Sequence, residues 1–414
     1  MHGHRAFLAT PAIAAAAVLG ILAAGCGGAR VPIEKAAISW RTLSCGGLEP
    51  RGMAVSALDS HRNRILLYGG IGASGESLGD LWEFRISDLS WRRIATGSQL
   101  SESAGPGPRH GMGGAIHLPR SDLFIFSGGA SRMSVGGKVL REIRKDAWAY
   151  PLWRKATDAG AWEILAPTHE WELGILPRGK FCANAFLDSA GGRFVLVGGG
   201  MDRGNAWTRD PEPSVWTLPM RPAPWWTRTP ARGDVPDLVG AAGALDVSRR
   251  RYLLFGGARP PAEQGGNAEF SSDVYSLRLF TLGWTRLSTS GAQPPPAIGA
   301  QAFLIPSCDA IVLLGGACLD SEGKLAPQKR IFAFLLGENR WTDITPSGAP
   351  DNPPWCSAFG TGQYDPSSGR IFLFGGLRLK PGASYPFEPP EHAEPTGETV
   401  VIEGFPGADR SEAR

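Results

Sequence analysis

A short apolar segment that ends in two glycines occurs six times along the 414-residue chain. The second glycines of successive copies lie 59, 70, 58, 59 and 60 residues apart. Spacing this regular indicates that one supersecondary unit is repeated, and such units bury their apolar faces by stacking on neighbours. The six pairs are Gly69-Gly70, Gly128-Gly129, Gly198-Gly199, Gly256-Gly257, Gly315-Gly316 and Gly375-Gly376.

Each diglycine segment is predicted to be the second of four short strands, which we call a to d. The four or five residues before the glycines are apolar at consecutive positions, a pattern typical of a strand buried on both faces. A segment that begins near a proline precedes each copy, and an apolar segment with a large side chain follows it. Four strands in each period are the signature of a propeller blade. In five copies a tryptophan opens strand d, at Trp91, Trp162, Trp226, Trp284 and Trp341.

This pattern resembles the kelch repeat family over residues 37–404, with a diglycine after strand b, an aromatic residue in strand c and a tryptophan in strand d. The resemblance implies an all-β fold, a six-bladed kelch-type β-propeller. The glycines allow positive φ angles, and we expect a neighbouring ring to lie against a position that lacks Cβ. The repeated aromatic side chains are expected to fill the space between blades rather than to bind a ligand.

The two ends of the repeat region predict how the ring of blades closes. A strand c follows Gly376 but no later tryptophan does, whereas an unmatched ISWRTLS segment around Trp40 precedes the first diglycine. We therefore expect residues 37–43 to pair with residues 399–403 as the outermost strand of the sixth blade. This closure by an N-terminal outer strand removes the unpaired edges of an open ring.

Composition excludes several other classes of protein. Glycine and proline, 56 and 34 residues, are too frequent for long helices, while 43% hydrophobic residues and 14 tryptophans are too many for a disordered chain. The net charge of +3 provides no long-range field that would attract nucleic acid or an anionic membrane surface. We therefore expect no nucleic-acid partner.

The N-terminal 25 residues have the pattern of a signal peptide. Basic residues are followed by nineteen uncharged residues from Ala6 to Ala24. The LAAGC sequence resembles a bacterial lipoprotein signal, in which Cys26 receives the lipid after cleavage behind Gly25. The following Gly27 resembles the outer-membrane sorting pattern of Gram-negative lipoproteins. An uncleaved anchor is the alternative, because nineteen uncharged residues are just long enough to span a bilayer core.

These features predict a lipid-anchored protein of the cell envelope, in the outer membrane, which contacts the membrane through its lipid only. They divide the chain into a signal peptide (1–25), a tether (26–36), the propeller (37–404) and a C-terminal tail (405–414).

Five cysteines remain beside Cys26, so at least one thiol is expected to stay unpaired. Cys308 and Cys318 flank an apolar strand, which would hold them too far apart for a disulfide. A pair of Cys45 and Cys356 stays open as the alternative to small buried thiols.

The unequal loops predict which face of the ring binds a ligand. Loops b–c and d–a share one face, and the b–c loops are long, as ligand-binding loops on rigid scaffolds commonly are. Arg51, Arg109 and Arg178 precede strand a in the first three units, and Asp237 and Trp355 stand near that place in the fourth and sixth. Such a cluster suits an anionic or sugar ligand. Alternatively, Pro-Arg belongs to the blade consensus and pairs with a neighbouring blade.

Other motifs give no firm chemistry. Residues 75–79, GESLG, fit G-x-S-x-G, but the motif lies between two predicted strands rather than at a strand-to-helix turn. The histidines lack zinc-site spacings. The copper residues of galactose oxidase find no counterpart, and the iron pattern of nitrile-specifier kelch proteins fails because Leu277 stands where histidine is needed. We expect neither metal nor cofactor.

Two function classes remain. The favoured one is a monomeric extracytoplasmic scaffold that binds a protein or glycan through its long-loop face. The alternative is a carbohydrate-active enzyme, such as a sugar-acid epimerase or mutarotase. A buried carboxylate with a perturbed pKa beside the arginines at the mouth of the channel would favour the enzyme.

We predict that Cys26 is acylated. Labelling of cells with a radioactive fatty acid is expected to mark the wild-type protein and not the Cys26→Ala variant, because only the cysteine thiol accepts the lipid. Equal labelling of both proteins, or a mature N-terminus at another residue, would contradict this prediction.

Overall fold

The structure is a computed structural model that describes residues 31–33, 37–44, 46–96, 105–118, 123–136, 138–153, 162–166, 177, 179–202, 207–208, 213–220, 225–261, 268–380, 383 and 392–407. Within these residues the protein is built from β-strands, with one 3₁₀ turn at Pro306–Cys308. The prediction of an all-β fold is confirmed. In the described part of the chain, no helix has the length and apolar character needed to cross a membrane.

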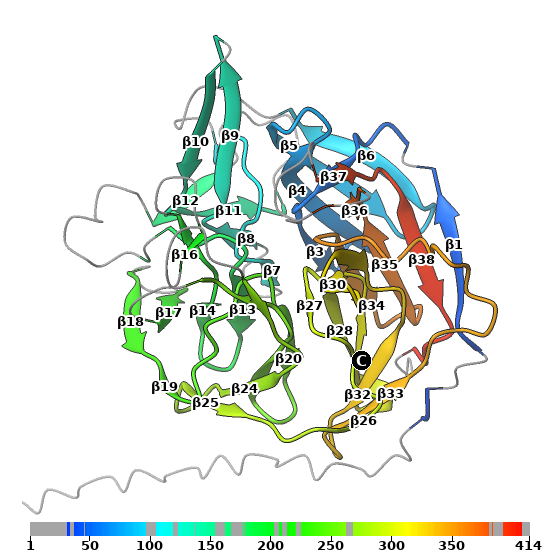
Figure 1. Ribbon diagram of the computed structural model, residues 1–414. Helices are drawn as coiled ribbons and strands as arrows, with labels where there is room; N and C mark the ends of the chain where they lie inside the picture. Colours follow the sequence, from blue (N-terminus) through cyan, green and yellow to red (C-terminus); the bar gives the residue numbers. More distant parts are fainter. Residues whose placement is uncertain are drawn as a thin grey trace, which may run out of the picture.

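Six antiparallel four-stranded sheets form the body of the molecule, and we number them along the chain (Figure 1). From the innermost strand outward, sheet 1 comprises β3 (Val55–Asp59), β4 (Arg64–Gly72), β5 (Ser77–Arg85) and β6 (Ser90–Ala95). Sheet 2 comprises β7 (Ala115–Leu118), β8 (Leu123–Ser127), β11 (Ala147–Pro151) and β12 (Glu163–Ala166). Sheet 3 comprises β13 (Asn184–Asp188), β14 (Arg193–Val197), β17 (Ser214–Pro219) and β18 (Thr227–Pro230).

Sheets 4 to 6 repeat this order. Sheet 4 comprises β20 (Ala242–Asp246), β21 (Arg251–Phe255), β24 (Val274–Arg278) and β25 (Gly283–Arg286). Sheet 5 comprises β28 (Gln301–Ile305), β29 (Ala310–Leu314), β32 (Phe332–Leu335) and β33 (Arg340–Asp343). Sheet 6 comprises β34 (Thr361–Asp365), β35 (Arg370–Phe374), β38 (Thr399–Glu403) and β1 (Ser39–Leu43). Short strands pair at the margins of three sheets: β2 (Arg51–Gly52) with β4, β19 (Arg232–Gly233) with β25, and β26 (Ser290–Gly291) with β33.

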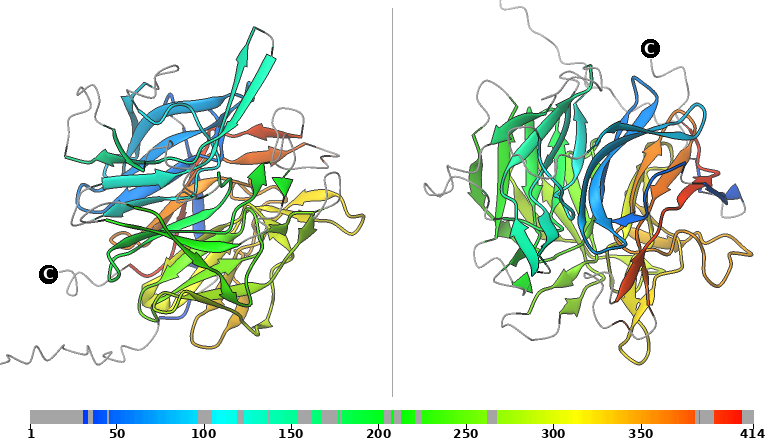
Figure 2. Two further views of the ribbon diagram at one scale, coloured as in Figure 1. Left: turned by 90° about the vertical axis from the view of Figure 1, so that its left-hand side faces the viewer. Right: turned by 90° about the horizontal axis from the view of Figure 1, so that it is seen from above.

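The innermost strands surround a common centre, and each of them contacts its two neighbours in a closed cycle (Figures 1 and 2). Six apolar clusters follow the same cycle, one between each pair of consecutive sheets. Between sheets 6 and 1, for example, the ring of Trp91 lies 4.8 Å from that of Phe374. The tryptophans at the start of strand d in sheets 1, 3, 4 and 5 are buried as expected. They are Trp91, Trp226, Trp284 and Trp341.

A ring of six backbone hydrogen bonds lies where the chain enters the innermost strands. Each sheet contributes one residue with positive φ, whose amide N–H donates to the carbonyl oxygen of the equivalent residue in the preceding sheet. The N···O distances are 2.8–3.2 Å. Every sheet is therefore tied to both of its neighbours close to the axis. The six residues are Met53, Gly111, Cys182, Gly240, Gly299 and Phe359.

The diglycines form a second belt of contacts between neighbouring sheets. The N–H of Gly70 donates to the carbonyl oxygen of Arg109 in the next sheet at 2.9 Å. A Cβ added to Gly69 would lie 2.5 Å from that same oxygen. The positive φ expected at both glycines is confirmed, but a carbonyl oxygen, and not an aromatic ring, approaches the site without Cβ. Five further bonds repeat this contact: Gly129 to Lys180, Gly199 to Leu238, Gly257 to Ala297, Gly316 to Ser357 and Gly376 to Arg51.

The predicted pairing of the two chain ends is confirmed. Strand β1 runs antiparallel to β38, with Ser39 opposite Glu403 and Leu43 opposite Thr399, and the two strands lie side by side in Figure 1. The packed region extends beyond the predicted limit at residue 404. Phe405 is buried, and the carbonyl oxygen of Pro406 accepts the hydroxyls of Ser307 and Tyr364.

The b–c connections carry extra strands. The largest is a hairpin in sheet 2, formed by β9 (Ala130–Val135) and β10 (Lys138–Ile143), which extends away from the body (Figures 1 and 2). Shorter pairs lie in the connections of sheet 3, with β15 (Met201–Asp202) and β16 (Trp207–Thr208), and of sheet 4, with β22 (Ala258–Arg259) and β23 (Glu269–Phe270). In sheet 5 the pair is β30 (Ala317–Leu319) and β31 (Leu325–Pro327), and β27 (Ala297–Ile298) also pairs with β30. In sheet 6 it is β36 (Leu377–Leu379) and β37 (Ala393–Pro395).

Removal of β1 is predicted to abolish cooperative unfolding. A chain without residues 27–44 would leave the edge of β38 unpaired and remove Trp40, whose ring lies 5.1 Å from that of buried Trp355. Denaturant unfolding followed by tryptophan fluorescence tests this expectation. Deletion of residues 27–36 alone is the control, since it retains β1. A cooperative, wild-type transition in the longer deletion would contradict the role of β1.

Candidate functional site

The arginines predicted to bind a ligand are buried in ion pairs. Arg51 is 2% exposed and holds Asp80 through two bonds of 2.6 and 3.0 Å. Arg109 is 0% exposed and holds Asp146 in the same way, at 2.7 and 3.0 Å. Each guanidinium also donates to the carbonyl oxygen of the first glycine of its own sheet, Gly69 or Gly128.

The two aspartates are ionised partners of these arginines. Asp80 also accepts the indole N–H of Trp82, and Asp146 accepts that of Trp148, both at 2.6 Å. Burial opposes ionisation of Asp146, but the guanidinium of Arg109 outweighs it and holds the pKa of the carboxyl below its usual range. The pKa of Asp80 is lowered in the same way by Arg51.

These contacts bear on the choice between enzyme and scaffold. Asp80 and Asp146 are carboxylates with perturbed pKa values beside the arginines, as expected of an enzyme, but the shift is downward, whereas a general acid needs a raised pKa. Neither aspartate lines the central pocket. The paired groups connect the start of a sheet to its own strand c and diglycine. This geometry favours the alternative interpretation, in which Pro-Arg is part of the repeat, although the side chains pair within their own sheet.

The third unit has a lysine at the position that arginine occupies in the first two. Arg178 lies outside the described residues. Lys180 takes the place of Arg51 and Arg109 in the repeat, because its carbonyl oxygen accepts the N–H of Gly129. Lys180 is buried and has interaction partners. The positive-φ residue of the ring follows the proline by three positions in the first two units, at Met53 and Gly111, and by five in the third, at Cys182, so Lys180 matches the two arginines.

The remaining predicted site residues do not join the arginines. Trp355 is buried between sheets 5 and 6, where its indole N–H donates to the carbonyl oxygen of Lys329 at 3.0 Å. Asp237 is half-buried and lines a small pocket together with Lys180. Cys26 lies outside the described residues. The described residues therefore contain no cluster of the predicted kind at the axis.

A serine and a histidine that no sequence motif pairs lie in contact. Ser77 of the GESLG segment and Nδ1 of His110 lie 2.8 Å apart, and Ser77 Oγ also accepts the N–H of Arg132 at 2.8 Å. Burial, with nearby Arg141 and Arg132, lowers the pKa of His110 to about 3. A base this weak activates a hydroxyl poorly near neutral pH. The pair instead connects β5 to the stem of the β9–β10 hairpin.

The β9–β10 hairpin is anchored along β9 and exposed along β10. Arg132 Nη1 donates to the carbonyl oxygen of Gly75 at 2.6 Å, and the N–H of Ser134 donates to Glu76 at 3.1 Å. By contrast, Val139 and Leu140 on β10 are 57% and 52% exposed. In the described sheets, β10 pairs with β9 alone. The hairpin thus presents a strand edge with apolar side chains to solvent.

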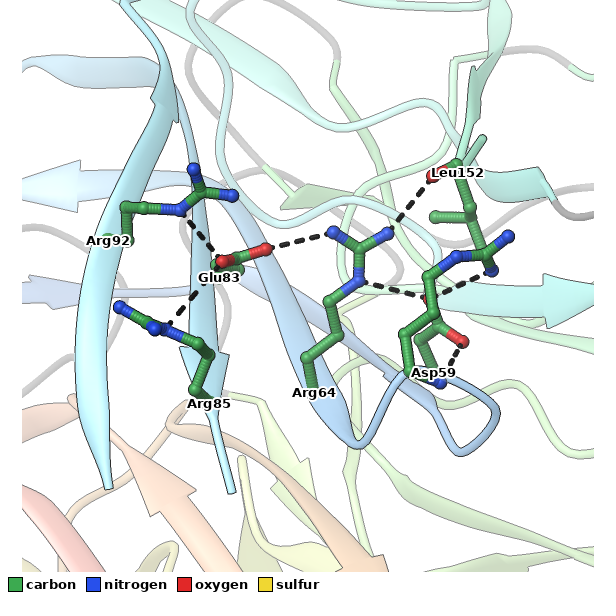
Figure 3. A network of polar contacts seen from close by, with 7 residues as sticks. Asp59, Arg64, Glu83, Arg85, Arg92 and Leu152 are labelled. Atoms are coloured by element: carbon green, nitrogen blue, oxygen red, sulfur yellow. Dashed lines mark hydrogen bonds and ion pairs between the residues drawn. The ribbon is translucent and has the colours of Figure 1, made fainter. Parts of the chain in front are cut away.

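Polar clamps connect neighbouring sheets on the opposite face, which carries the a–b and c–d turns. Arg64 binds Asp59 of its own a–b turn and Glu83 of β5, and it donates to the carbonyl oxygen of Leu152 in the next sheet (Figure 3). Glu83 is further bound by Arg92 at 2.8 Å. Two other sheets repeat the clamp, through Asp188, Arg193 and Leu279, and through Asp246, Arg251 and Leu336.

A central cavity of about 670 Å³ lies inside the ring of inner strands. At the b–c end the six residues of the hydrogen-bonded ring line it. One apolar cluster packs at this end and includes Met53, Phe181, Ile298 and Phe359. At the other end it reaches the a–b turns, where exposed Ser189 lines it. The cavity therefore has its mouth on the face of the a–b turns.

The described residues contain no group of three or more histidine, cysteine or acidic side chains arranged to hold a metal ion. Among the described cysteines, Cys182, Cys308, Cys318 and Cys356 are free thiols, and burial raises the pKa of each. Cys45 lies outside the described residues. The expected absence of a Cys308–Cys318 disulfide agrees with these free thiols.

Similarity to known proteins is distant and partial. No family model matches the chain. It is 27% identical over 339 residues to the putative adagio-like protein 2 of Oryza sativa subsp. japonica. This match covers 77% of this chain and 46% of that protein. It is 23% identical over 256 residues to multiple epidermal growth factor-like domains protein 8 of Mus musculus, covering 61% and 8%. Host cell factor 1 of Homo sapiens is 24% identical over 186 residues, covering 44% and 9%.

The chain thus spans less than a tenth of two of these relatives and less than half of the third. All three are kelch or propeller-type proteins, and the similarity is consistent with the kelch family at a coarse level.

Replacement of Arg109 by alanine is predicted to destabilise the fold by about 3–5 kcal/mol, because Asp146 would remain buried without a counter-charge. The control Arg340→Ala removes an exposed pair with Glu338 and is expected to cost about 0–1 kcal/mol. Denaturant unfolding measures both changes.

The same pair predicts a pH dependence of stability. Because the folded-state pKa of Asp146 is depressed, its contribution is present above about pH 4, the unfolded value, and is lost as the pH falls through the folded value. Wild-type stability should therefore fall more steeply on acidification below about pH 4 than that of Arg109→Ala. Equal stability of the wild type and Arg109→Ala would refute the structural role of the pair.

Proposed function

We propose that this protein is a six-bladed kelch-type propeller that serves as a scaffold for a protein partner, and that the partner docks on the face of the b–c connections through the β9–β10 hairpin. The closed cycle of six sheets supports the blade number. The distant similarity to kelch-type proteins supports a binding scaffold.

The single observation that carries the proposal is the hairpin itself. The b–c connections of sheets 3 to 6 also contain a pair of strands, but those strands have only two or three residues each, whereas β9 and β10 have six each and project from the body (Figures 1 and 2). Strand β9 is anchored on sheet 1 by Arg132 and Ser134, so the exposed strand β10 that pairs with it is held in a defined place. A preorganised strand edge with exposed apolar side chains suits addition of a strand from a partner.

Charge indicates the chemistry of that partner. Within the hairpin, residues 130–143 contain three basic side chains, Arg132, Lys138 and Arg141, and one acidic side chain, Glu142. Since the whole chain has a net charge of only +3, this excess is local to the hairpin. An acidic segment on the partner would complement it and would be attracted most strongly at low ionic strength.

Location is the second part of the proposal. Lipid attachment at Cys26 would hold the scaffold at the envelope membrane, most simply the outer membrane, with residues 26–36 as the tether. A fixed position at a membrane suits a protein whose task is to recruit a partner, because confinement raises the effective concentration of the two proteins.

The hairpin is predicted to be needed for partner binding. In the first variant, residues 131–142 are replaced by two glycines, and in a second variant Val139 and Leu140 become serine. Chemical crosslinking in cells, followed by mass spectrometry, is expected to identify a partner with the wild type and to lose it with both variants. The crosslinked segment on the partner is expected to be acidic, and the complex to dissociate as salt is raised.

A matched control changes the opposite face. Phe280 in the c–d turn of sheet 4 is 92% exposed, and Phe280→Ala is expected to retain the partner. The proposal fails if the hairpin variants, with unchanged melting temperatures, still form the same complex, or if only Phe280→Ala loses it.

A further inference from the structure

We propose that the central cavity is a second binding site, entered from the face of the a–b turns, and that it takes an uncharged sugar. This site is separate from the hairpin face, and the inference does not depend on the proposed protein partner. Its volume of about 670 Å³ falls within the range of about 300–1,000 Å³ found for small-molecule sites.

The position of the cavity determines how a ligand would enter. The ring of hydrogen bonds and its apolar filling close the end toward the b–c connections. A Cβ on Gly111 or Gly299 would overlap the ring of Phe181 or Phe359, at 2.3 and 2.8 Å. The aromatic rings thus pack against the hydrogen-bonded ring, so a ligand would enter from the opposite end, at the a–b turns.

Polar side chains without charge line the cavity. Among the lining residues are the amides of Asn184, Gln301 and Gln363 and the hydroxyls of Ser56 and Thr361. The described lining contains no lysine, arginine, histidine, aspartate or glutamate. Burial also raises the pKa of Tyr252, and that of Tyr364 to about 12, so both phenols are neutral near pH 7.

Two of the amides retain hydrogen-bonding capacity. Gln363 uses its Nε2 end to donate to the carbonyl oxygen of Ser56 at 3.1 Å, and Gln301 uses its own to donate to that of Ala300 at 3.2 Å. No hydrogen bond within the described residues engages the Oε1 end of either amide. These two ends, on neighbouring strands β34 and β28, are acceptors for a ligand hydroxyl.

Apolar groups alternate with these amides. Phe186, Phe303 and Tyr364 line the same cavity, and the rings of Phe186 and Tyr252 are stacked with centroids 4.0 Å apart. A sugar has hydroxyls for the amides and C–H faces for the aromatic surface. A charged ligand would lose its hydration without meeting a counter-charge in the described lining, which is costly. The lining therefore selects a neutral, polyhydroxylated molecule.

Titration calorimetry of the full chain with glucose, galactose, mannose and N-acetylglucosamine tests the inference, with glucuronate as the charged comparison. At least one neutral sugar is expected to bind at millimolar concentration or below, and glucuronate is expected not to bind. The double variant Gln301→Leu, Gln363→Leu should weaken binding at least about tenfold, the loss expected when ligand hydrogen bonds are removed.

Matched variants distinguish binding in the cavity from binding elsewhere on the protein. Gln293→Leu changes an exposed glutamine of a d–a loop and is expected to bind as the wild type does. Ala302→Leu narrows the cavity without removing a hydrogen bond, so it should also reduce binding, and its melting temperature shows whether it is folded. The hairpin deletion should leave sugar binding unchanged, which separates this site from the proposed partner site.

Three results would overturn the inference. They are the absence of binding by all four neutral sugars, equal binding of glucuronate, and wild-type affinity in both the glutamine double variant and Ala302→Leu. The first of these means that the cavity holds water only.

Discussion

The ring of six backbone hydrogen bonds is the constraint on which the arrangement of the sheets depends. An N–H group buried near the axis must find an acceptor, since an unpaired one costs free energy. Each of the six N–H groups finds its acceptor in the preceding sheet, and the first finds it in the sixth. The cycle therefore needs all six sheets in place. It also needs positive φ at each position, which non-glycine residues adopt at Met53, Cys182 and Phe359.

The repeated sequence features serve this ring. The diglycines add a second belt of hydrogen bonds further from the axis, and the Arg–Asp pairs hold the segment between the two belts in sheets 1 and 2. This explains why arginine recurs at the start of units without forming a ligand cluster. An arginine that supports a backbone turn by binding Asp80 or Asp146 has its charge neutralised by that carboxylate.

The strands, their order and the closure by residues 37–43 are predictable because they depend on local pattern and on a regular period. The equivalence of Lys180 to Arg109 is not predictable, because the register is set by the positive-φ residue of the ring, and a cysteine at 182 carries no signal for that conformation. The contact of Ser77 with His110 joins two sheets across 33 residues. The sequence does carry a signal for the hairpin, because the interval of 70 residues between Gly129 and Gly199 is longer than the others and contains Gly136 and Gly137, a turn signal.

The two faces of the molecule differ because the ring separates them. On the b–c side, the diglycine belt and the apolar filling leave no opening at the axis, so variation in the connections produces projecting elements such as β9–β10. On the a–b side, the Asp–Arg clamps tie the turns to their neighbours at the periphery, and the axis stays open. Small side chains at Ala54, Ala185 and Ala302 line the space that remains. If both proposals hold, the projecting hairpin and the cavity lie on opposite faces of the ring, so each can change in sequence without disturbing the other.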